Sequence, residues 1–338
     1  MVSASREEVA RAAQVSVRTV SNVLSGTVRV APSTRDRVLR AIDELDYQPS
    51  EIGRMLKTGR TGMIGLVLPG VDAPYFAELS REIIAAAAAR GYTVFLDQTD
   101  GEAAREREVL ARADARALFE GLIINPLALT KEDLQHAPAG RPVVLLGEEE
   151  HAGFDRVCID NFGAAVVAVD HLFESGRRNI VAIGAEREHR SSSAIRLAGY
   201  EHAMANRGLT PKAEYVPDFH RSSGADAMTR ILDRGELPDA IFCFSDLLAL
   251  GALRILRERS ISVPDQVAIV GFDDIEEGAF SWPNLTTIAP DKGAIAAEAV
   301  RLLVERIEGV QRGTQLVTPP YRLIVRESSA GAGVSVVN

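Results

Sequence analysis

The sequence predicts an α/β protein, in which an N-terminal all-α head precedes a larger body of doubly wound parallel sheets. Two observations carry this prediction. The first 58 residues hold only helical patterns, whereas from Met63 onward short apolar runs alternate with helical segments. Fully apolar strands that alternate with helices are typical of parallel sheets covered on both faces. Roughly 270 residues of this pattern favour two subdomains over one.

The head is expected to contain three helices, over Arg6–Ala13, Val17–Leu24 and Pro32–Leu45. Ser5 and Ser16 stand where helix N-caps belong, and Pro32 suits a first helical turn. A further short helix is expected over Glu51–Leu56, before a linker over Thr58–Gly62.

The body is expected to alternate strands with helices along its whole length. The expected strands are Met63–Leu68, Thr93–Asp97, Leu122–Asn125, Val143–Leu146, Ile180–Ile183, Ile241–Phe244 and Val267–Phe272. The expected helices are Tyr75–Arg90, Glu102–Ala117, Asn161–Ser175, Ser191–Arg207, Gly224–Asp233, Asp246–Arg259 and Gly293–Gly309. Ligands of such folds bind beyond the carboxyl ends of the strands, so two facing subdomains are expected to enclose one cleft.

The distribution of charge separates the head from the body. The whole chain has a formal net charge of −9, which by itself argues against a nucleic-acid-binding protein. Residues 1–60, however, hold ten Lys/Arg against seven Asp/Glu, so the head is basic and the acidic excess lies in the body. A basic head on an acidic body suits a protein whose head touches phosphates.

The sequence lacks the features that are typical of membrane, secreted, metal-binding and several enzyme classes of protein. No apolar run reaches the roughly 20 residues that cross a bilayer, and no signal-peptide core follows the N-terminus. Cys158 and Cys243 lie in apolar runs, as reduced core residues of a cytoplasmic protein do. No Walker loop, GxGxxG, GxSxG or metal-ligand spacing is present, so no enzyme activity, cofactor or metal is expected.

Val9–Leu24 has the pattern of a helix-turn-helix, with a tight turn between two short helices. A small apolar core is expected from Val9, Ala13, Val15, Val20, Val23 and Leu24. The polar face or start of the second helix holds Ser16, Val17, Arg18, Thr19, Ser21 and Asn22. Such a helix lies in the major groove, where Arg pairs with guanine, Asn with adenine and Val with a thymine methyl. Spacing alone leaves open an ordinary helical hairpin with a solvated face.

Particular residue strings then give a resemblance to the lactose-repressor/galactose-repressor (LacI/GalR) family of bacterial transcription regulators. In the head they are Val9-Ala10, Val15-Ser16, Thr19-Val20-Ser21, Val23-Leu24, Thr34–Val38, Ala41–Pro49 and Leu56–Thr61. In the body they are Ile64–Val67, Gly121–Ile124, Arg196–Tyr200, Ala249–Ala252, Val270–Asp274 and Leu285–Ile288. The resemblance extends to about Arg326.

The resemblance implies roles for residues of the head. Val17, Arg18 and Asn22 match variable base-contacting positions, while Ser16, Thr19 and Ser21 suit phosphate oxygens. Arg29 and Thr34 match backbone contacts, and Leu56 matches the leucine of a hinge helix that wedges into the central base step. The alternative for Leu56 is a packing residue before the linker.

Some residues of the head depart from the family pattern. Asn22 stands where many members carry arginine, so a different operator preference is expected. Gly53 and Glu51 place a poor helix former and a negative charge in the hinge, and Ala31 replaces the usual N-cap serine. The hinge is therefore expected to order less readily than in relatives.

The resemblance also implies a body with the periplasmic-binding-protein fold. The expected division is residues 1–49 for the DNA-binding domain, 50–61 for the hinge, 62–160 with 292–320 for one effector subdomain, and 161–291 with 321–330 for the other. Crossings between subdomains are expected near residues 160, 291 and 320.

Position by position, the implied effector residues are Tyr75, Phe76, Arg190, Ser192, Arg196, Phe219, Ser245, Asp246 and Asp273. An Arg and an Asp that face each other suit sugar hydroxyls, whereas Arg190 with Arg196 would equally favour a phosphate or carboxylate. Alternatives remain: Arg196 and Asp273 as a structural ion pair, and Tyr75 and Phe76 as core residues. Gly147 stands where some sugar binders have an acidic residue.

The function expected from these features is an allosteric regulator, most often a repressor in this family, of a catabolic operon. A homodimer is expected to bind a pseudo-palindromic double-stranded operator under the control of a sugar-like effector. The alternatives are a cytoplasmic or transport-type sugar-binding module without a regulatory role, and a sugar-metabolising enzyme. The effector, its sign of action and the operator are not encoded in any motif.

Overall fold

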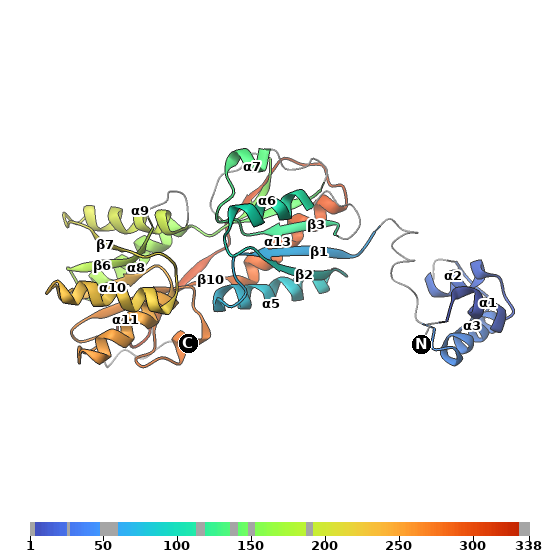
Figure 1. Ribbon diagram of the computed structural model, residues 1–338, viewed down its shortest axis with the longest axis horizontal. Coiled ribbons are helices and arrows are strands. Elements are labelled where there is room, and N and C mark those ends of the chain that lie inside the picture. Colours follow the sequence, from blue (N-terminus) through green and yellow to red (C-terminus); the bar gives the residue numbers. More distant parts are fainter. Residues whose placement is uncertain are drawn as a thin grey trace. The chain divides into compact units, whose positions relative to one another are not determined.

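The computed structural model describes residues 4–25, 28–47, 60–112, 119–135, 141–147, 153–186 and 192–330. It divides into two compact units, Met1–Thr61 and Gly62–Asn338, which are considered separately (Figure 1). The expected hinge helix with Leu56, and the candidate effector residue Arg190, lie outside the described residues. Within the described part of the chain, no helix is long and apolar enough to cross a membrane.

The head consists of α1 (Arg6–Ala12), α2 (Val17–Ser25) and α3 (Pro32–Glu44). Helix α1 begins with a capping box, in which the Glu8 amide donates to Ser5 Oγ and the Ser5 amide donates to the Glu8 carboxylate. Helix α3 begins with Pro32, and Ala31 before it supplies no side-chain cap, as its methyl group dictates. The helix-turn-helix is thus built from local signals.

A small core holds the three helices of the head together. Its buried members are Val9, Ala10, Ala13, Val20, Val23, Val38, Ala41 and Tyr47. Val15 and Leu24, expected in the core, pack against it while partly exposed. Gln14 adopts a φ of 51° between α1 and α2, which turns the chain tightly enough for α2 to cross α1.

The first sheet of the body is parallel throughout, in the order β11-β5-β4-β3-β1-β2. Its strands are β1 (Met63–Leu68), β2 (Thr93–Gln98), β3 (Gly121–Ile124), β4 (Val143–Leu146), β5 (Asp155–Val157) and β11 (Leu316–Val317). Helices α5 (Pro74–Ala88) and α13 (Lys292–Ile307) cover one face. Helices α6 (Ala103–Arg112) and α7 (Lys131–Gln135) cover the other.

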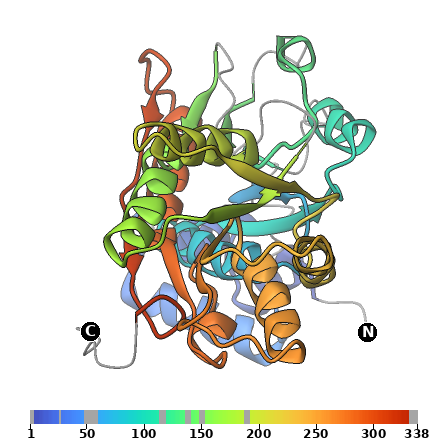
Figure 2. The same cartoon turned by 90° about the vertical axis from the view of Figure 1, so that its left-hand side faces the viewer.

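The second sheet has the order β12-β10-β9-β8-β6-β7 and belongs to the half of the body nearest the viewer in Figure 2. Its strands are β6 (Ile180–Ala185), β7 (Lys212–Tyr215), β8 (Ala240–Cys243), β9 (Ala268–Phe272), β10 (Thr286–Pro290) and β12 (Tyr321–Ile324). Helices α8 (Asn161–Glu174) and α9 (Ser192–Ala205) cover one face, and α10 (Arg221–Asp233) and α11 (Asp246–Glu258) the other. The short α12 (Glu276–Ala279) follows β9.

The fold class predicted from sequence is confirmed, with one difference in the second sheet. Strand β12 runs antiparallel to β10, whereas only parallel pairing was expected. It enters the sheet at its edge, where an extra strand needs no helical crossover. The chain passes between the two sheets after β5, after β10 and after β11.

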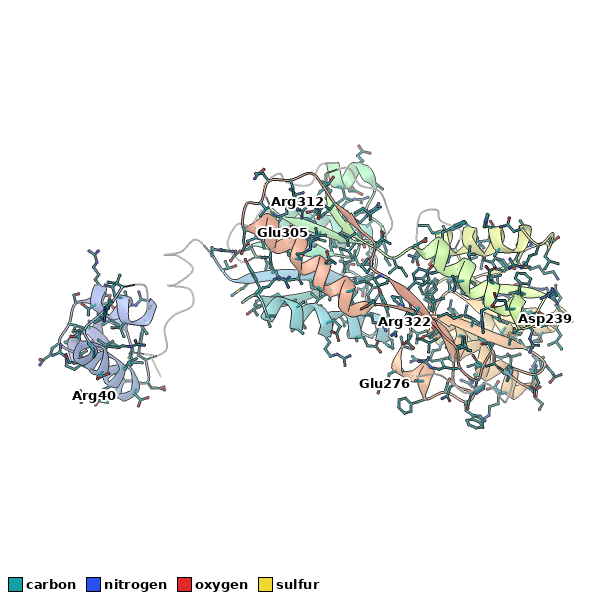
Figure 3. All side chains as sticks on the ribbon, turned by 180° about the vertical axis from the view of Figure 1, so that it is seen from behind. Arg40, Asp239, Glu276, Glu305, Arg312 and Arg322 are labelled. Atoms are coloured by element: carbon teal, nitrogen blue, oxygen red, sulfur yellow. The ribbon has the colours of Figure 1, made fainter. Side chains whose placement is uncertain are left out.

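A buried carboxylate anchors the C-terminal end of α13 to the first sheet. Asp155 is 2% exposed and accepts hydrogen bonds from Arg306 Nε (2.8 Å), Arg312 Nη1 (2.8 Å) and the Gln315 amide (2.8 Å). Arg312 also donates to Glu305, its neighbour at that end of the helix (Figure 3). These donors hold the pKa of Asp155 below its ordinary value although burial raises it.

Replacing Asp155 with Asn is expected to lower the free energy of unfolding by about 3 kcal/mol, because two arginines lose a buried counter-charge. Urea unfolding of Asp155→Asn measures this, with Asp226→Asn on the exposed face of α10 as the control. Since the folded-state pKa is depressed, the difference between parent and variant should shrink as pH falls through that pKa. A difference that is constant down to acid pH would contradict the role of the charge.

Candidate functional site

The first residues of α2 form an exposed surface on the head. Ser16, Val17 and Arg18 are exposed, with Val17 at 38%, while Val20 and Val23 on the opposite side are buried. Ser16 caps the helix, since its Oγ accepts from the Thr19 amide at 3.1 Å. The chain therefore presents a valine and an arginine at a helix N-terminus, where the peptide dipoles favour an anion.

The remaining candidate DNA contacts surround this surface. Thr19, Ser21 and Asn22 are half-buried along α2, and Arg6 Nη1 donates to Ser21 Oγ at 3.5 Å. Arg29 is exposed ahead of α3, and Thr34 lies half-buried in the first turn of α3. The structure thus places every described candidate of the head at the start of α2, on α2, ahead of α3 or on the first turn of α3.

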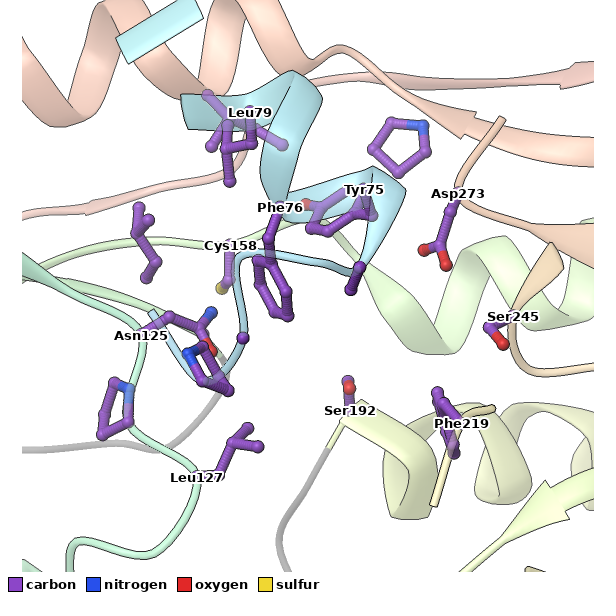
Figure 4. A pocket seen from close by; sticks show the side chains of 18 of the residues that line it. Tyr75, Phe76, Leu79, Asn125, Leu127, Cys158, Ser192, Phe219, Ser245 and Asp273 are labelled. Atoms are coloured by element: carbon purple, nitrogen blue, oxygen red, sulfur yellow. The ribbon is translucent and has the colours of Figure 1, made fainter. Parts of the chain in front are cut away.

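A cavity of about 640 Å³ lies in the body, where the carboxyl ends of the strands of the two sheets meet (Figure 4). This volume falls in the range of small-molecule sites. Both halves of the body line it, because Tyr75, Asn125 and Cys158 belong to the first sheet and its loops, and Ser192 and Asp273 belong to the second. The expected cleft is therefore present as a single cavity.

Aromatic side chains line the cavity from both halves. Tyr75 and Phe76, in the first turn of α5, meet edge to face with ring centroids 5.3 Å apart. Both rings line the cavity and also pack against the hydrophobic core. The alternative that Tyr75 and Phe76 are core residues is therefore only part of their role. Phe219 lines the opposite wall (Figure 4). Flat apolar surfaces of this kind suit the faces of sugar or other rings.

Arg196 is fixed at the charged end of the cavity. It is 8% exposed, and its guanidinium carbon lies 3.5 Å from the centroid of the Phe272 ring. Nε donates to Asn161 Oδ1 at 2.7 Å, and Nη1 donates to the Phe244 carbonyl. These two hydrogen bonds and the contact with the Phe272 ring hold the Arg196 side chain in place at the cavity wall.

Asp273 also lines the cavity (Figure 4). No hydrogen bond or ion pair of the described chain joins its carboxylate to Arg196, so the structural ion pair considered for these residues is not formed. Burial raises the pKa of Asp273 to about 7, against the opposing attraction of Arg196 and Lys292. Asp273 therefore brings a hydrogen-bond acceptor, and Arg196 a donor, to the lining of the same cavity.

Ser245 and Asp246 take different places although they are neighbours. Ser245 lines the cavity and caps α11, accepting from the Leu248 amide at 3.3 Å. Asp246 is fully buried beside the cavity wall and accepts from Thr287 Oγ1 at 2.6 Å and the Ile275 amide at 3.0 Å. Burial raises the pKa of Asp246 well above its ordinary value. The structure does not bring Asp246 into the cavity, contrary to its expected place among the effector residues.

Several cavity residues were missed from sequence. Asn125 follows β3 directly, Gln98 ends β2, and Cys158 follows β5. Asp72, Asp100, Asn161 and His220 are further polar lining residues that were missed, and Asp100 is already bonded to Gln98 and Arg105. The sequence contained a signal for these residues, because polar side chains at the carboxyl ends of parallel strands mark the edge of the sheet where ligands bind. No cluster of metal-binding side chains occurs among the described residues.

Known proteins match both parts of the chain. Residues 7–50 match "Bacterial regulatory proteins, lacI family", and residues 169–329 match "Periplasmic binding protein-like domain". A relative from Haemophilus influenzae, "HTH-type transcriptional repressor PurR", is 34% identical over 330 residues, which cover 95% of this chain and 97% of the relative. The chain belongs to the lacI family.

Solved structures of lacI-family proteins share the fold over 80% or more of this chain. The lac repressor dimer bound to operator and the anti-inducer ONPF is 26% identical with a TM-score of 0.87, over 97% of this chain and 99% of that one. The complex of the regulator CelR with cellobiose is 31% identical with a TM-score of 0.72, over 96% and 99%. A LacI-family regulator from Sanguibacter keddieii is 40% identical with a TM-score of 0.73, over 80% and 100%.

Proposed function

We propose that this lacI-family regulator is an operator-binding repressor, active in the cytoplasm, whose DNA affinity is set by a neutral polyhydroxylated effector. One observation carries the proposal: a single chain combines an exposed recognition-helix surface with a ligand-sized cavity shared by two sheets. The match of the head to the family over residues 7–50 favours a regulator over a transport-type binding module or an enzyme.

The charges of the cavity support a neutral effector over an anionic one. Arg196 has two of its nitrogens committed within the protein, and Asp72, Asp100 and Asp273 also line the space. A phosphate would meet these carboxylates, whereas hydroxyl groups donate to a carboxylate and accept from a guanidinium. Arg190, which would strengthen the anionic alternative, lies outside the described residues. The related CelR and lac repressor structures hold cellobiose and ONPF respectively.

The residues proposed for each role follow from their places. For DNA we propose Ser16, Val17, Arg18, Thr19, Ser21, Asn22, Arg29, Thr34 and Leu56. For the effector we propose Tyr75, Phe76, Arg190, Ser192, Arg196, Phe219, Ser245 and Asp273, joined by Asn125. We propose the domain boundaries expected above, with Asp246 moved from ligand contact to support of the cavity wall.

The first experiment is a thermal-shift screen of the full chain against cellobiose, monosaccharides, sugar phosphates and purines. A hit is then tested for protection of Cys158 from the thiol reagent DTNB, because Cys158 lines the cavity while the only other cysteine, Cys243, is fully buried. A neutral saccharide should stabilise the protein and slow modification. Stabilisation by phosphorylated compounds or purines alone would contradict the proposed effector class.

We propose that the regulator works as a homodimer, so that two heads bind a pseudo-palindromic operator. Phe280 and Trp282, in the loop after α12, are 81% and 79% exposed, and a second copy would bury this apolar surface. Trp282→Glu is expected to shift the protein from dimer to monomer in sedimentation velocity, with Tyr215→Glu on the exposed edge strand β7 as the control. A Trp282→Glu protein that stays dimeric would place the contact elsewhere.

The affinity for a neutral saccharide is expected to rise with pH through about 7, the pKa of Asp273. Hydroxyl groups bond best to the ionised carboxylate, so binding favours loss of its proton. The stability of the protein without ligand should depend on pH in the opposite direction. Because folding raises the pKa of Asp273, its contribution to the free energy of unfolding is lost as pH rises through about 7. Calorimetric titration across neutral pH measures the affinity, and Asp273→Asn should flatten the profile. An unchanged slope in that variant would assign the pH dependence to a group other than Asp273.

A further inference from the structure

The turn from Asp273 to Glu276, between β9 and α12, has a strained backbone. Asp273 and Asp274 both adopt positive φ, at 115° and 50°, and neither is glycine. Such conformations are unfavourable for a residue with a side chain, and they persist only where the surrounding structure fixes them. Because Asp273 lines the cavity, the groups that fix this turn also decide where its carboxylate lies.

One set of these groups belongs to the second sheet. The Asp273 amide donates to the Ile288 carbonyl at 2.8 Å, and the Asp274 amide donates to Thr287 Oγ1 at 3.3 Å. The Ile275 amide donates to the buried Asp246 at 3.0 Å. These contacts move together with the second sheet, so by themselves they would hold the turn in any arrangement of the two halves.

A second set comes from the other half of the body. Glu78, on α5, accepts from the Glu276 amide at 3.2 Å and from Lys292 Nζ at 2.6 Å. Lys292, the first residue of α13 after the crossing from β10, also donates to the Asp274 carbonyl at 2.9 Å. Both side chains are shielded, at 24% and 12% exposure, so their charges are only partly screened by solvent. The strained turn is thus tied to α5 and α13, the two helices that cover one face of the first sheet.

The same group of residues borders the cavity on its aromatic side. Tyr75 lies one helical turn before Glu78 on α5, and Lys292 Nζ is 5.7 Å from the centroid of its ring. Tyr75 and Asp273, from opposite halves, both line the cavity. A molecule that touches both therefore stabilises the arrangement in which Glu78 reaches the turn.

We propose that Glu78 is a positioning residue that couples the Asp273–Glu276 turn to the first half of the body, so that the ligand-binding geometry exists only when the halves are close. The proposal rests on the effector site proposed above. Separation of the halves removes the Glu78 contacts and releases the turn. A ligand that bridges Tyr75 and Asp273 has a higher affinity for the closed arrangement, which is the difference that an allosteric effector requires.

The test compares Glu78→Ala with Glu82→Ala in the full chain. Glu82 lies one turn further along α5, its side chain is 40% exposed, and its ion pair is with the adjacent Arg81. The readout is the rate at which DTNB modifies Cys158 without operator or ligand, so it does not depend on the proposed effector. We expect at least about threefold faster modification in Glu78→Ala and the parent rate in Glu82→Ala, because an opened cleft exposes the thiol.

Glu78→Gln distinguishes positioning from general packing. Its amide oxygen can still accept from the Glu276 amide, while the ion pair with Lys292 is lost, so an intermediate rate is expected. A folded Glu78→Ala protein with the parent rate would overturn the proposal. If Glu78→Ala does not fold, Glu78→Gln decides in the same way, and modification no faster than the parent would overturn it. If cellobiose binds, the change that it causes in operator affinity should shrink by about 2- to 30-fold in Glu78→Ala.

Discussion

Arg18→Ala is expected to weaken binding to the cognate operator by about 5- to 150-fold, because one bidentate contact to a base contributes roughly 1–3 kcal/mol. Arg18 is exposed at the start of α2, and the buried side of that helix is fixed by Val20 and Val23. The substitution therefore removes a base contact without disturbing the core of the head. Gel-shift titration at fixed salt measures the loss, since the phosphate contribution varies steeply with ionic strength.

The matched control is Arg40→Ala, an exposed arginine on α3 whose Nε donates to the Asp36 carbonyl in its own helix. It removes the same charge from the head but lies outside the recognition helix (Figure 3). We expect a small loss with Arg40→Ala and no change in base preference. If Arg18→Ala loses its preference at one base pair of the operator, that base pair is the one that Arg18 contacts. Equal losses in both variants at all base pairs would reduce Arg18 to a general electrostatic contact.

Leu56→Ala extends the same assay to the hinge. If Leu56 wedges into the operator, its truncation should lower affinity with little effect on salt dependence, because no charge is removed. Parent-like operator binding by both Arg18→Ala and Leu56→Ala would contradict the proposed head.

The fold was predictable where local signals agree with the final packing. Ser5 with Glu8 and Ser16 with Thr19 specify helix starts within four residues, and the structure forms both. Strands such as Met63–Leu68 are long and almost wholly apolar because helices bury both faces. Short or polar strands were not predictable in this way. β7, with the sequence Lys-Ala-Glu-Tyr, and the two-residue β11 form because a sheet edge is already there to pair with.

The candidate site was predictable in its residues more than in their roles. Tyr75, Phe76, Ser192, Arg196, Phe219, Ser245 and Asp273 line one cavity although they come from five separate segments. The role of Asp246 depends on Thr287, 41 residues away, which takes one oxygen of its carboxylate. The role of Glu78 depends on Lys292, which is 214 residues away. Partners at such distances in sequence are set by sheet order, which no local pattern records.

Arg196→Met is expected to leave operator binding intact and to weaken effector binding by about 10- to 150-fold, the range for loss of one charged hydrogen bond. Methionine keeps an unbranched apolar chain over the Phe272 ring but supplies no donor to the ligand, to Asn161 or to the Phe244 carbonyl. Asp273 also loses an attraction that opposes its raised pKa, so more of its carboxyl is protonated at neutral pH. Both changes act on the ligand, and neither lies in the head.

Calorimetric titration with the saccharide found by thermal shift measures the affinity for the effector. Gel shift with and without that saccharide measures the change that it causes in operator affinity. Arg254→Met is the control, because Arg254 is exposed on α11 and paired with Glu258 in its own helix. Arg196→Lys should recover only part of the affinity, since an ammonium cannot reproduce the planar fork that contacts Asn161 and Phe244 together. If the saccharide changes operator affinity in Arg196→Met as it does in the parent, binding at this cavity does not control the operator. Loss of operator binding in the same variant, without effector, would show that the charged end of the cavity supports the repressing state itself.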